Sequence, residues 1–191
     1  MEEAFLKEDV KTRLLLAGLK ELADFGARDF SLRRAAVAAG VSCAAPYRYF
    51  KDKDEYVAEI ISYLSSRWEL MAREIVKSYE PFGHSLIAEL AVANVRFWLS
   101  HKNAASVLLM GGEGITYKSS SLFGKALSEK LYSFFNSQGC GEGYVKEKVT
   151  AVRALLIGYL SLITSGELPD TAESLSGIKT QIDNFLFSEN L

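Results

Sequence analysis

Apolar side chains recur along almost the whole chain at intervals of three and four residues, the spacing of one face of an α-helix. No stretch shows the two-residue alternation of a half-buried β-strand. Proline, which interrupts helices, occurs only 3 times in 191 residues. The pattern predicts an all-α protein, and a hydrophobic content of 49% is ample for a packed core.

Glycine, proline and capping residues divide this pattern into nine predicted helices. They cover residues 8–25, 31–39, 42–50, 52–79, 85–100, 104–110, 119–137, 144–165 and 171–187. The fourth is long enough to connect two modules. We therefore expect an N-terminal three-helix domain over residues 1–52 and a larger helical domain over residues 53–191.

The junction between the second and third predicted helices has the composition of a helix-turn-helix. Gly40 permits the left-handed backbone of the turn, Val41 fills the space between the helices, and Ser42 caps the helix that follows. Alanines at positions 35, 36, 38, 39, 44 and 45 let the two helices cross closely. Such a motif predicts that the third helix enters the major groove of DNA.

Positive charge is concentrated around this motif, although the whole chain has a net charge of −2. Residues 28–53 contain six arginines and lysines and two aspartates, a local charge of +4. The rest of the chain is correspondingly acidic. A basic patch in an acidic protein is typical of a localised DNA-contacting surface.

The stretch from Ser31 to Lys53 resembles the TetR family of bacterial transcriptional regulators. The matching positions are Ala39, Gly40, Val41 and Ser42 at the turn, Tyr47, Tyr49, Phe50 and Lys53 after it, and Ser31 before it. The resemblance covers residues 8–58. It implies a helix-turn-helix DNA-binding domain, followed by a ligand-binding and dimerisation domain, in a homodimer that acts as a repressor and is released by a small molecule.

The resemblance also implies a role for each matched position on a double-stranded DNA operator. The residues expected to contact phosphates are Ser31, Arg33, Tyr47, Tyr49 and Lys53. The residues expected to face the major groove are Ser42, Cys43, Ala44 and Ala45. Because Cys43 and the alanine methyl groups have little hydrogen-bonding capacity, we expect base recognition to depend on thymine-methyl contacts, Arg48 and DNA shape.

The chain departs from the family pattern at two positions. Ala35 replaces a larger aliphatic residue, and Pro46 lies inside the predicted third helix. If Ser42 is the N-cap, Pro46 is the fourth helical residue, so the missing N–H costs little but tilts the helix. We expect this to change which bases are recognised rather than whether DNA is bound.

Two amphipathic helices close the chain. In the last one, Leu175, Ile178, Ile182 and Phe185 form a narrow stripe suited to a helix–helix seam. The helix before it has a wider apolar surface than one stripe needs, and two such helices from each chain would form a four-helix bundle. The expected dimer interface is Val152, Leu156, Tyr159, Leu175, Ile178, Ile182 and Phe185. The alternative is that both helices pack only within one chain.

Aromatic residues are frequent in the middle of the chain. The resemblance implies that these helices enclose an effector pocket, and the residues expected to line it are Trp68, Phe97, Trp98, Met110 and Tyr117. On composition alone, its ligand would be a small apolar or aromatic molecule. The alternative for each of these side chains is ordinary core packing.

Other kinds of chemistry have little support in the sequence. The two cysteines and two histidines are too few for a disulfide framework or a zinc site, and nothing indicates a cofactor. The start of the chain does not resemble a signal peptide, and the apolar stretch 149–163 is too short to span a bilayer, which predicts a cytoplasmic protein without a membrane partner. Two alternatives remain: a constitutive DNA-binding or protein-interaction dimer without an effector, and a helical enzyme, for which no catalytic pair is evident.

Overall fold

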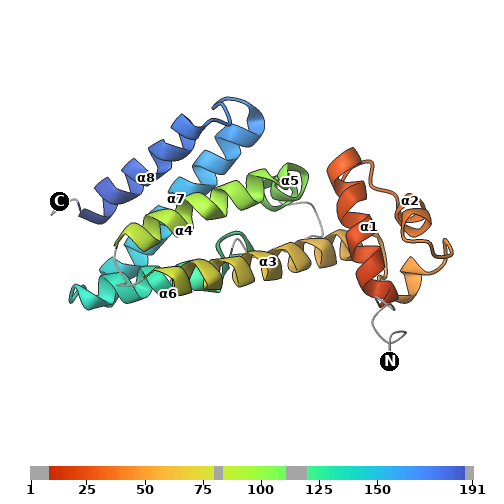
Figure 1. Ribbon diagram of the computed structural model, residues 1–191, viewed down its shortest axis with the longest axis horizontal. Helices are drawn as coiled ribbons and strands as arrows, with labels where there is room; N and C mark the ends of the chain where they lie inside the picture. The colour runs from red at the N-terminus through yellow and green to blue at the C-terminus, as the bar shows by residue number, and fades with distance from the viewer. Residues whose placement is uncertain (1–8, 80–83, 111–119, 188–191) are drawn as a thin grey trace.

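The structure is a computed structural model that describes residues 9–79, 84–110 and 120–187. Within these residues the chain forms eight α-helices and one 3-10 helix, and no strand. The predicted all-α class is confirmed. The helices before residue 53 form a small head at one end of the molecule, and α4 to α8 form a body at the other end (Figure 1). The long helix α3 runs from one to the other.

The head consists of α1 (Val10–Phe25), α2 (Leu32–Ala38) and the 3-10 helix η1 (Pro46–Arg48). Its core is aromatic and is centred on Tyr56 of α3. The ring of Phe50 stacks on Tyr56 at 4.1 Å, and Phe30 meets it edge-on at 5.2 Å. The head is therefore packed onto the first turns of α3.

Helix α3 (Lys53–Ser78) has the N-terminal cap that the sequence predicts. The Asp52 carboxylate accepts a hydrogen bond from the Glu55 N–H over 2.9 Å, and the Glu55 carboxylate in turn accepts from the N–H of Lys51. With 26 residues the helix is about 39 Å long. It is therefore long enough to run from the head to the body.

The body consists of α4 (His84–Leu99), α5 (Lys102–Met110), α6 (Ser120–Ser137), α7 (Glu142–Ser165) and α8 (Ala172–Phe187). Helix α4 is central and packs against α3, α6, α7 and α8. Most of its side chains are buried, as expected for a helix that is apolar around most of its circumference. Predicted and observed helix boundaries in this part agree to within two residues.

One further contact joins the head to the body. The Asn103 side chain at the start of α5 donates to two carbonyl groups at the end of α1, those of Leu22 over 3.1 Å and Ala23 over 2.8 Å. Both carbonyls belong to the last turn of α1, where carbonyl groups lack some of their helical partners, although that of Leu22 also accepts from the Gly26 N–H over 2.9 Å. The head is thus held at two places, by α3 and by α5.

Candidate DNA-binding site

The turn after α2 has the geometry that the sequence predicts. Gly40 has a φ of 68°, a left-handed conformation that favours glycine. Its N–H donates to the carbonyl of Val37, and the N–H of Val41 donates to that of Ala36, each over 3.0 Å. These bonds end α2 and reverse the chain, while Val41 packs against the core.

The segment after the turn is not the α-helix over residues 42–50 that the sequence predicts. The Ala45 N–H donates to Ser42 and the Arg48 N–H to Ala45, which is the three-residue spacing of a 3-10 helix. Pro46 is the physical reason. The first four-residue bond would run from position 46 to Ser42, and proline has no N–H to donate. The predicted third helix is therefore wrong in type and length, because its regular part is only η1.

The side chains predicted to contact DNA are accessible at the surface of the head. Tyr47 is 63% exposed and Tyr49 is 38% exposed, although aromatic residues usually lie in the core. Other exposed positions are Arg33, Ser42, Cys43, Ala44 and Arg48, whereas Ser31, Ala45 and Lys53 are partly exposed. This accessibility is compatible with the predicted contacts, which stay predictions.

The two neighbouring arginines of α2 differ in their environment. Arg34 forms an ion pair with Glu21 at 2.5 Å, donates to the Asp29 carbonyl over 2.6 Å, and lies 4.2 Å above the ring of Phe25. Glu21 is buried, so Arg34 neutralises a charge inside the head. Arg33 is exposed and has no such ion pair among the described residues. Arg34 is therefore structural, and Arg33 is the one available for phosphate.

Ser31 and Lys53 combine a structural contact with partial exposure. The Ser31 hydroxyl accepts from the Arg34 N–H over 3.4 Å, which makes it the predicted N-cap of α2. The Lys53 ammonium donates to the carbonyl of Arg28 over 3.0 Å. An ammonium has three donors, so Lys53 keeps two for another partner.

Tyr56 fixes the position of α1 against α3. Its hydroxyl donates to the carbonyl of Leu14, deep in the head. Burial, and to a smaller extent the charge of Glu21, raises the pKa of the Tyr56 hydroxyl well above its usual range. A residue at position 18 larger than glycine would collide with this ring, because a Cβ on Gly18 would lie 2.8 Å from it.

The aromatic residues predicted to line an effector pocket belong mainly to the core. Trp68 and Trp98 are completely buried, and each indole N–H donates to a backbone carbonyl of α6. Phe97 packs between them and contacts His101, whose pKa is lowered by burial. The two tryptophans expose no surface to a ligand in this structure, so their place in an effector pocket stays a prediction. The Met110 side chain and Tyr117 lie outside the described part.

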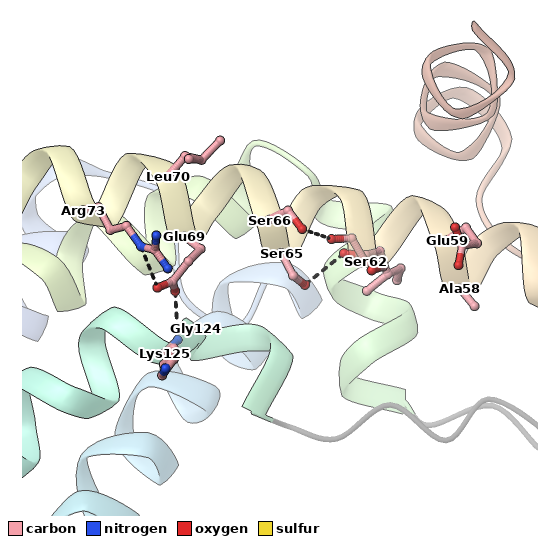
Figure 2. A pocket seen from close by; sticks show the side chains of 11 residues that line it. Ala58, Glu59, Ser62, Ser65, Ser66, Glu69, Leu70, Arg73, Gly124 and Lys125 are labelled. Carbon is pink, nitrogen blue, oxygen red and sulfur yellow. Dashed lines mark hydrogen bonds and ion pairs between the residues drawn. The ribbon is translucent and has the colours of Figure 1, made fainter. Parts of the chain in front are cut away.

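An open groove follows α3 on the side where α6 crosses it, with a volume of about 780 Å³. Figure 2 shows its two ends: Ala58 and Glu59 lie nearest the head, and Glu69, Arg73 and Lys125 lie near α6. Serine hydroxyls line the stretch between them. Polar and charged residues are frequent in its lining, but apolar atoms contribute most of the lining surface, so the groove does not by itself decide the chemical class of a ligand.

The predicted dimer seam lies inside one chain. Val152 and Leu156 of α7 and Ile178 and Ile182 of α8 are completely buried by neighbouring helices of the same chain, and Leu175 is nearly so. A side chain that is already buried cannot contact a second chain. For these residues the alternative of packing within the monomer holds, because α4 covers the apolar stripe of α8. Only Tyr159 and Phe185 of the predicted set keep partial exposure.

The sequence around the helix-turn-helix identifies the family. Residues 14–60 match the sequence model of the bacterial regulatory proteins of the tetR family. The matched range contains α1, α2, the turn at Gly40, η1 and the first turns of α3. Residues 14–60 of the chain belong to the TetR family by sequence. The resemblance predicted from Ser31 to Lys53 is confirmed.

Solved structures of TetR regulators share the fold over nearly the whole chain. A putative TetR-family transcriptional regulator from Mesorhizobium loti MAFF303099 gives a TM-score of 0.72 at 15% identity, covering 93% of this chain and 95% of that one. FadR from Bacillus subtilis in complex with stearoyl-CoA gives 0.69 at 13% identity, with 93% and 98% covered. A single-residue variant of TetR from Acinetobacter baumannii AYE in complex with minocycline gives 0.64 at 16% identity, with 91% and 92% covered. Among curated proteins, none matches the chain.

Sequence reasoning predicted surplus apolar surface on the helix that is now α7, but it did not name the residues that form its exposed face. Leu162 is 42% exposed, Ala154 is exposed, and Leu155 and Gly158 are partly exposed. By length and composition α7 could cross a membrane, with a mean hydropathy of 1.3 in its most apolar window, yet only 28% of that window is buried. The signal was present, since α7 has a wider apolar surface than its core stripe needs.

Proposed function

We propose that this chain is a homodimeric, sequence-specific DNA-binding transcriptional regulator of the cytoplasm, and that it acts as a repressor released by a small molecule. The observation that carries the proposal is the surface of the head. There, exposed hydroxyl, aromatic and basic side chains surround the short segment after the turn, within the part that matches the TetR family. Phosphate groups are the natural partners of such a surface.

In this proposal most side chains of the head contact phosphates, and few contact bases. Tyr47, Tyr49, Arg33 and the free donors of Lys53 hold the DNA backbone and fix the register. Base recognition depends on Arg48 and on the small groups of residues 42–45, which suit the thymine methyl group. Because η1 is short, each head recognises few bases, and two heads are needed for specificity.

The test is DNA binding by the purified protein, to fragments selected from random-sequence DNA and to the region upstream of its own gene. We expect tight binding that weakens steeply with salt, since phosphate contacts release counterions. Lys53→Glu should weaken binding to all sequences alike, and Tyr47→Phe with Tyr49→Phe should add to the loss. Lys77→Glu is the matched control, because Lys77 lies on the same helix and pairs only with the nearby Glu74 among the described residues. Binding that is absent, or unaffected by these changes, would refute the proposal.

The second copy needed for DNA binding is proposed to dock on the outer face of α7 and α8. Exposed apolar side chains of α7, Leu162 and Ala154 among them, form this face. Beside them a groove of about 510 Å³ between the two helices is lined by Ala151, Leu155, Gln181, Asn184 and Phe185. A second α7 packed against this face would bury the apolar surface and complete a four-helix bundle.

A small-molecule effector is supported by relatives of the same fold that are bound to minocycline and to stearoyl-CoA. The competing candidate is a constitutive DNA-binding dimer, which is favoured by the filled aromatic core around Trp68 and Trp98. The two are separated by screening compounds for release of the selected operator DNA. A compound that dissociates the wild-type complex at micromolar concentration supports an effector, and its heat of binding to the DNA-free protein measures the affinity. A screen without such a compound favours the constitutive dimer.

A further inference from the structure

Helix α6 is interrupted by a single residue. Gly124 has a φ of 69° and a ψ of 169°, whereas helical backbone continues on both sides of it. The φ value belongs to the region that favours glycine. A Cβ at this position would lie 2.7 Å from the indole nitrogen of Trp68 and 2.8 Å from a carboxylate oxygen of Glu69. The break therefore brings the backbone of α6 unusually close to α3.

Side chains of α3 and α4 satisfy the carbonyl groups before the break. The carbonyl of Leu122 accepts from the Asn94 amide over 2.7 Å and from the Trp98 indole over 2.6 Å. The carbonyl of Phe123 accepts from the Trp68 indole over 2.9 Å. All three donors are buried, and the two indoles are the only tryptophans of the chain. Water is excluded, so these bonds are costly to lose.

The amide groups after the break are satisfied by Glu69. One of its carboxylate oxygens accepts from the N–H of Lys125 over 2.9 Å and from the N–H of Ala126 over 3.2 Å. Its other oxygen accepts from Arg73 over 3.4 Å, as the dashed lines in Figure 2 show. A carboxylate at the first amides of a helix is a favourable N-terminal cap, but here the cap comes from another helix.

These bonds tie α6 to the helix that carries the head. Trp68 and Glu69 lie on α3, and Tyr56 of the same helix is the centre of the head core. In an uninterrupted α6, the backbone N–H and carbonyl groups would hydrogen-bond to one another along the helix. The side chains of Glu69, Trp68, Trp98 and Asn94 would then lose these backbone partners. The break thus fixes α3 against α6 as long as all these bonds are made.

We propose that Glu69 is a positioning residue: by capping α6 behind the break, it holds α3, and with it the head, in the orientation required for DNA binding. The inference rests on the proposed DNA-binding function. Glu69 also lines the open groove of α3, at the end near Arg73 and Lys125. A molecule in that groove can therefore reach the carboxylate that holds the two helices together.

The experiment compares the wild-type dimer with Glu69→Ala and Glu69→Gln on the selected operator. Glu74→Ala is the control, because Glu74 lies on the same helix and pairs only with exposed Lys77 among the described residues. We expect Glu69→Ala to weaken operator binding by about five-fold or more, the lower range of coupling between sites. It should also alter the preference among operators whose half-sites lie one base pair closer or farther apart. Tryptophan emission should shift, because both indoles lie at the break.

A merely structural role would lower the unfolding midpoint without changing the operator preference. Operator affinity within about two-fold of the wild type, with an unchanged spacing preference, would therefore overturn the inference. If Glu69→Ala does not fold, Glu69→Leu takes its place, because Leu offers no acceptor to the amide groups of Lys125 and Ala126. An affinity of Glu69→Leu equal to that of the wild type would again overturn the inference. Glu69→Gln keeps an acceptor and should retain more operator affinity than Glu69→Ala. A wild-type protein that binds no DNA would instead refute the proposed function itself.

Discussion

The head and the body use polar side chains for different purposes. In the head, Arg34 neutralises buried Glu21 and the buried Tyr56 hydroxyl donates to the Leu14 carbonyl, while the polar side chains around the turn, such as Arg33, Tyr47 and Arg48, stay at the surface. In the body, the buried side chains of Trp68, Trp98 and Asn94 donate hydrogen bonds to backbone carbonyl groups of α6, where water is excluded. The head therefore keeps free polar groups for an outside partner, whereas the body uses its buried ones to hold itself together.

The free surfaces of the two regions differ accordingly. The head exposes tyrosine hydroxyls and basic groups, which suit an anionic partner. The body exposes the apolar face of α7, centred on Leu162, which suits a second copy of the chain. In the proposed function, DNA contact and self-association would therefore use two chemically different surfaces, a polar and basic one on the head and an apolar one on the body.

The largest expected effect is at a buried position of the body. Ile182→Asp would place a charge where no part of the side chain is exposed to solvent. We expect it to lower the free energy of unfolding by about 4 kcal/mol or more, which denaturant titration would measure. A variant that stays as stable as the wild type would show that Ile182 is not core.

The apolar face of α7 should behave differently. Leu162→Asp leaves the core intact, and we expect a folded monomer of 21.1 kDa in place of the dimer, measured by light scattering. Operator affinity should fall by about 100-fold or more, because one of two half-sites is lost. A dimeric Leu162→Asp protein would place the interface elsewhere.

The break in α6 provides the next test. Gly124→Ala combines an unfavourable left-handed φ with overlap against Trp68, so we expect a loss of about 1–3 kcal/mol in the free energy of unfolding. Gly143→Ala is the matched control, since a Cβ there has no neighbour within 4 Å. It should change stability by about 0.5 kcal/mol or less in either direction. Equal effects of the two substitutions would contradict the tight contact at Gly124.

The two arginines of α2 separate stability from DNA binding within the head. Arg34→Gln leaves buried Glu21 without its cation, so we expect a loss of about 1–2 kcal/mol in thermal or denaturant unfolding. Arg33→Gln should leave stability within about 0.5 kcal/mol and reduce the salt slope of operator binding by about 1. The opposite outcome would assign the phosphate contact to Arg34.

The smallest effect concerns pH. Burial lowers the pKa of His101, so the folded protein disfavours the protonated ring. The neutral ring contributes stability above the unfolded pKa of about 6.5, and this contribution is lost as the pH falls through the folded value. The unfolding midpoint should therefore fall more between pH 7.5 and 5 for the wild type than for His101→Gln. Parallel pH profiles of the two proteins would rule out this role.

Much of the head was predictable from sequence because its determinants are local. Ser31 caps α2, Gly40 turns the chain and Asp52 caps α3, and each acts within about four residues of its own position. The exception is the segment 42–50. There the loss of one N–H at Pro46 outweighed the helical pattern and left only η1.

The helices of the body could be predicted from the sequence, but which of their apolar faces are buried within the chain could not. An apolar stripe such as that of Ile178 and Ile182 predicts that a helix face is buried. The sequence pattern of the stripe is the same whether that face packs against α4 or against another chain. Glu69 gave no sign of its role, because its partners at Lys125 and Ala126 are more than 50 residues away. The sequence by itself thus determined most of the helices, the caps at Ser31 and Asp52, and the TetR family match of residues 14–60, which depend on neighbours along the chain. Only the tertiary structure decided which apolar faces became core, which stayed free, and where α6 breaks, because these depend on contacts between distant residues.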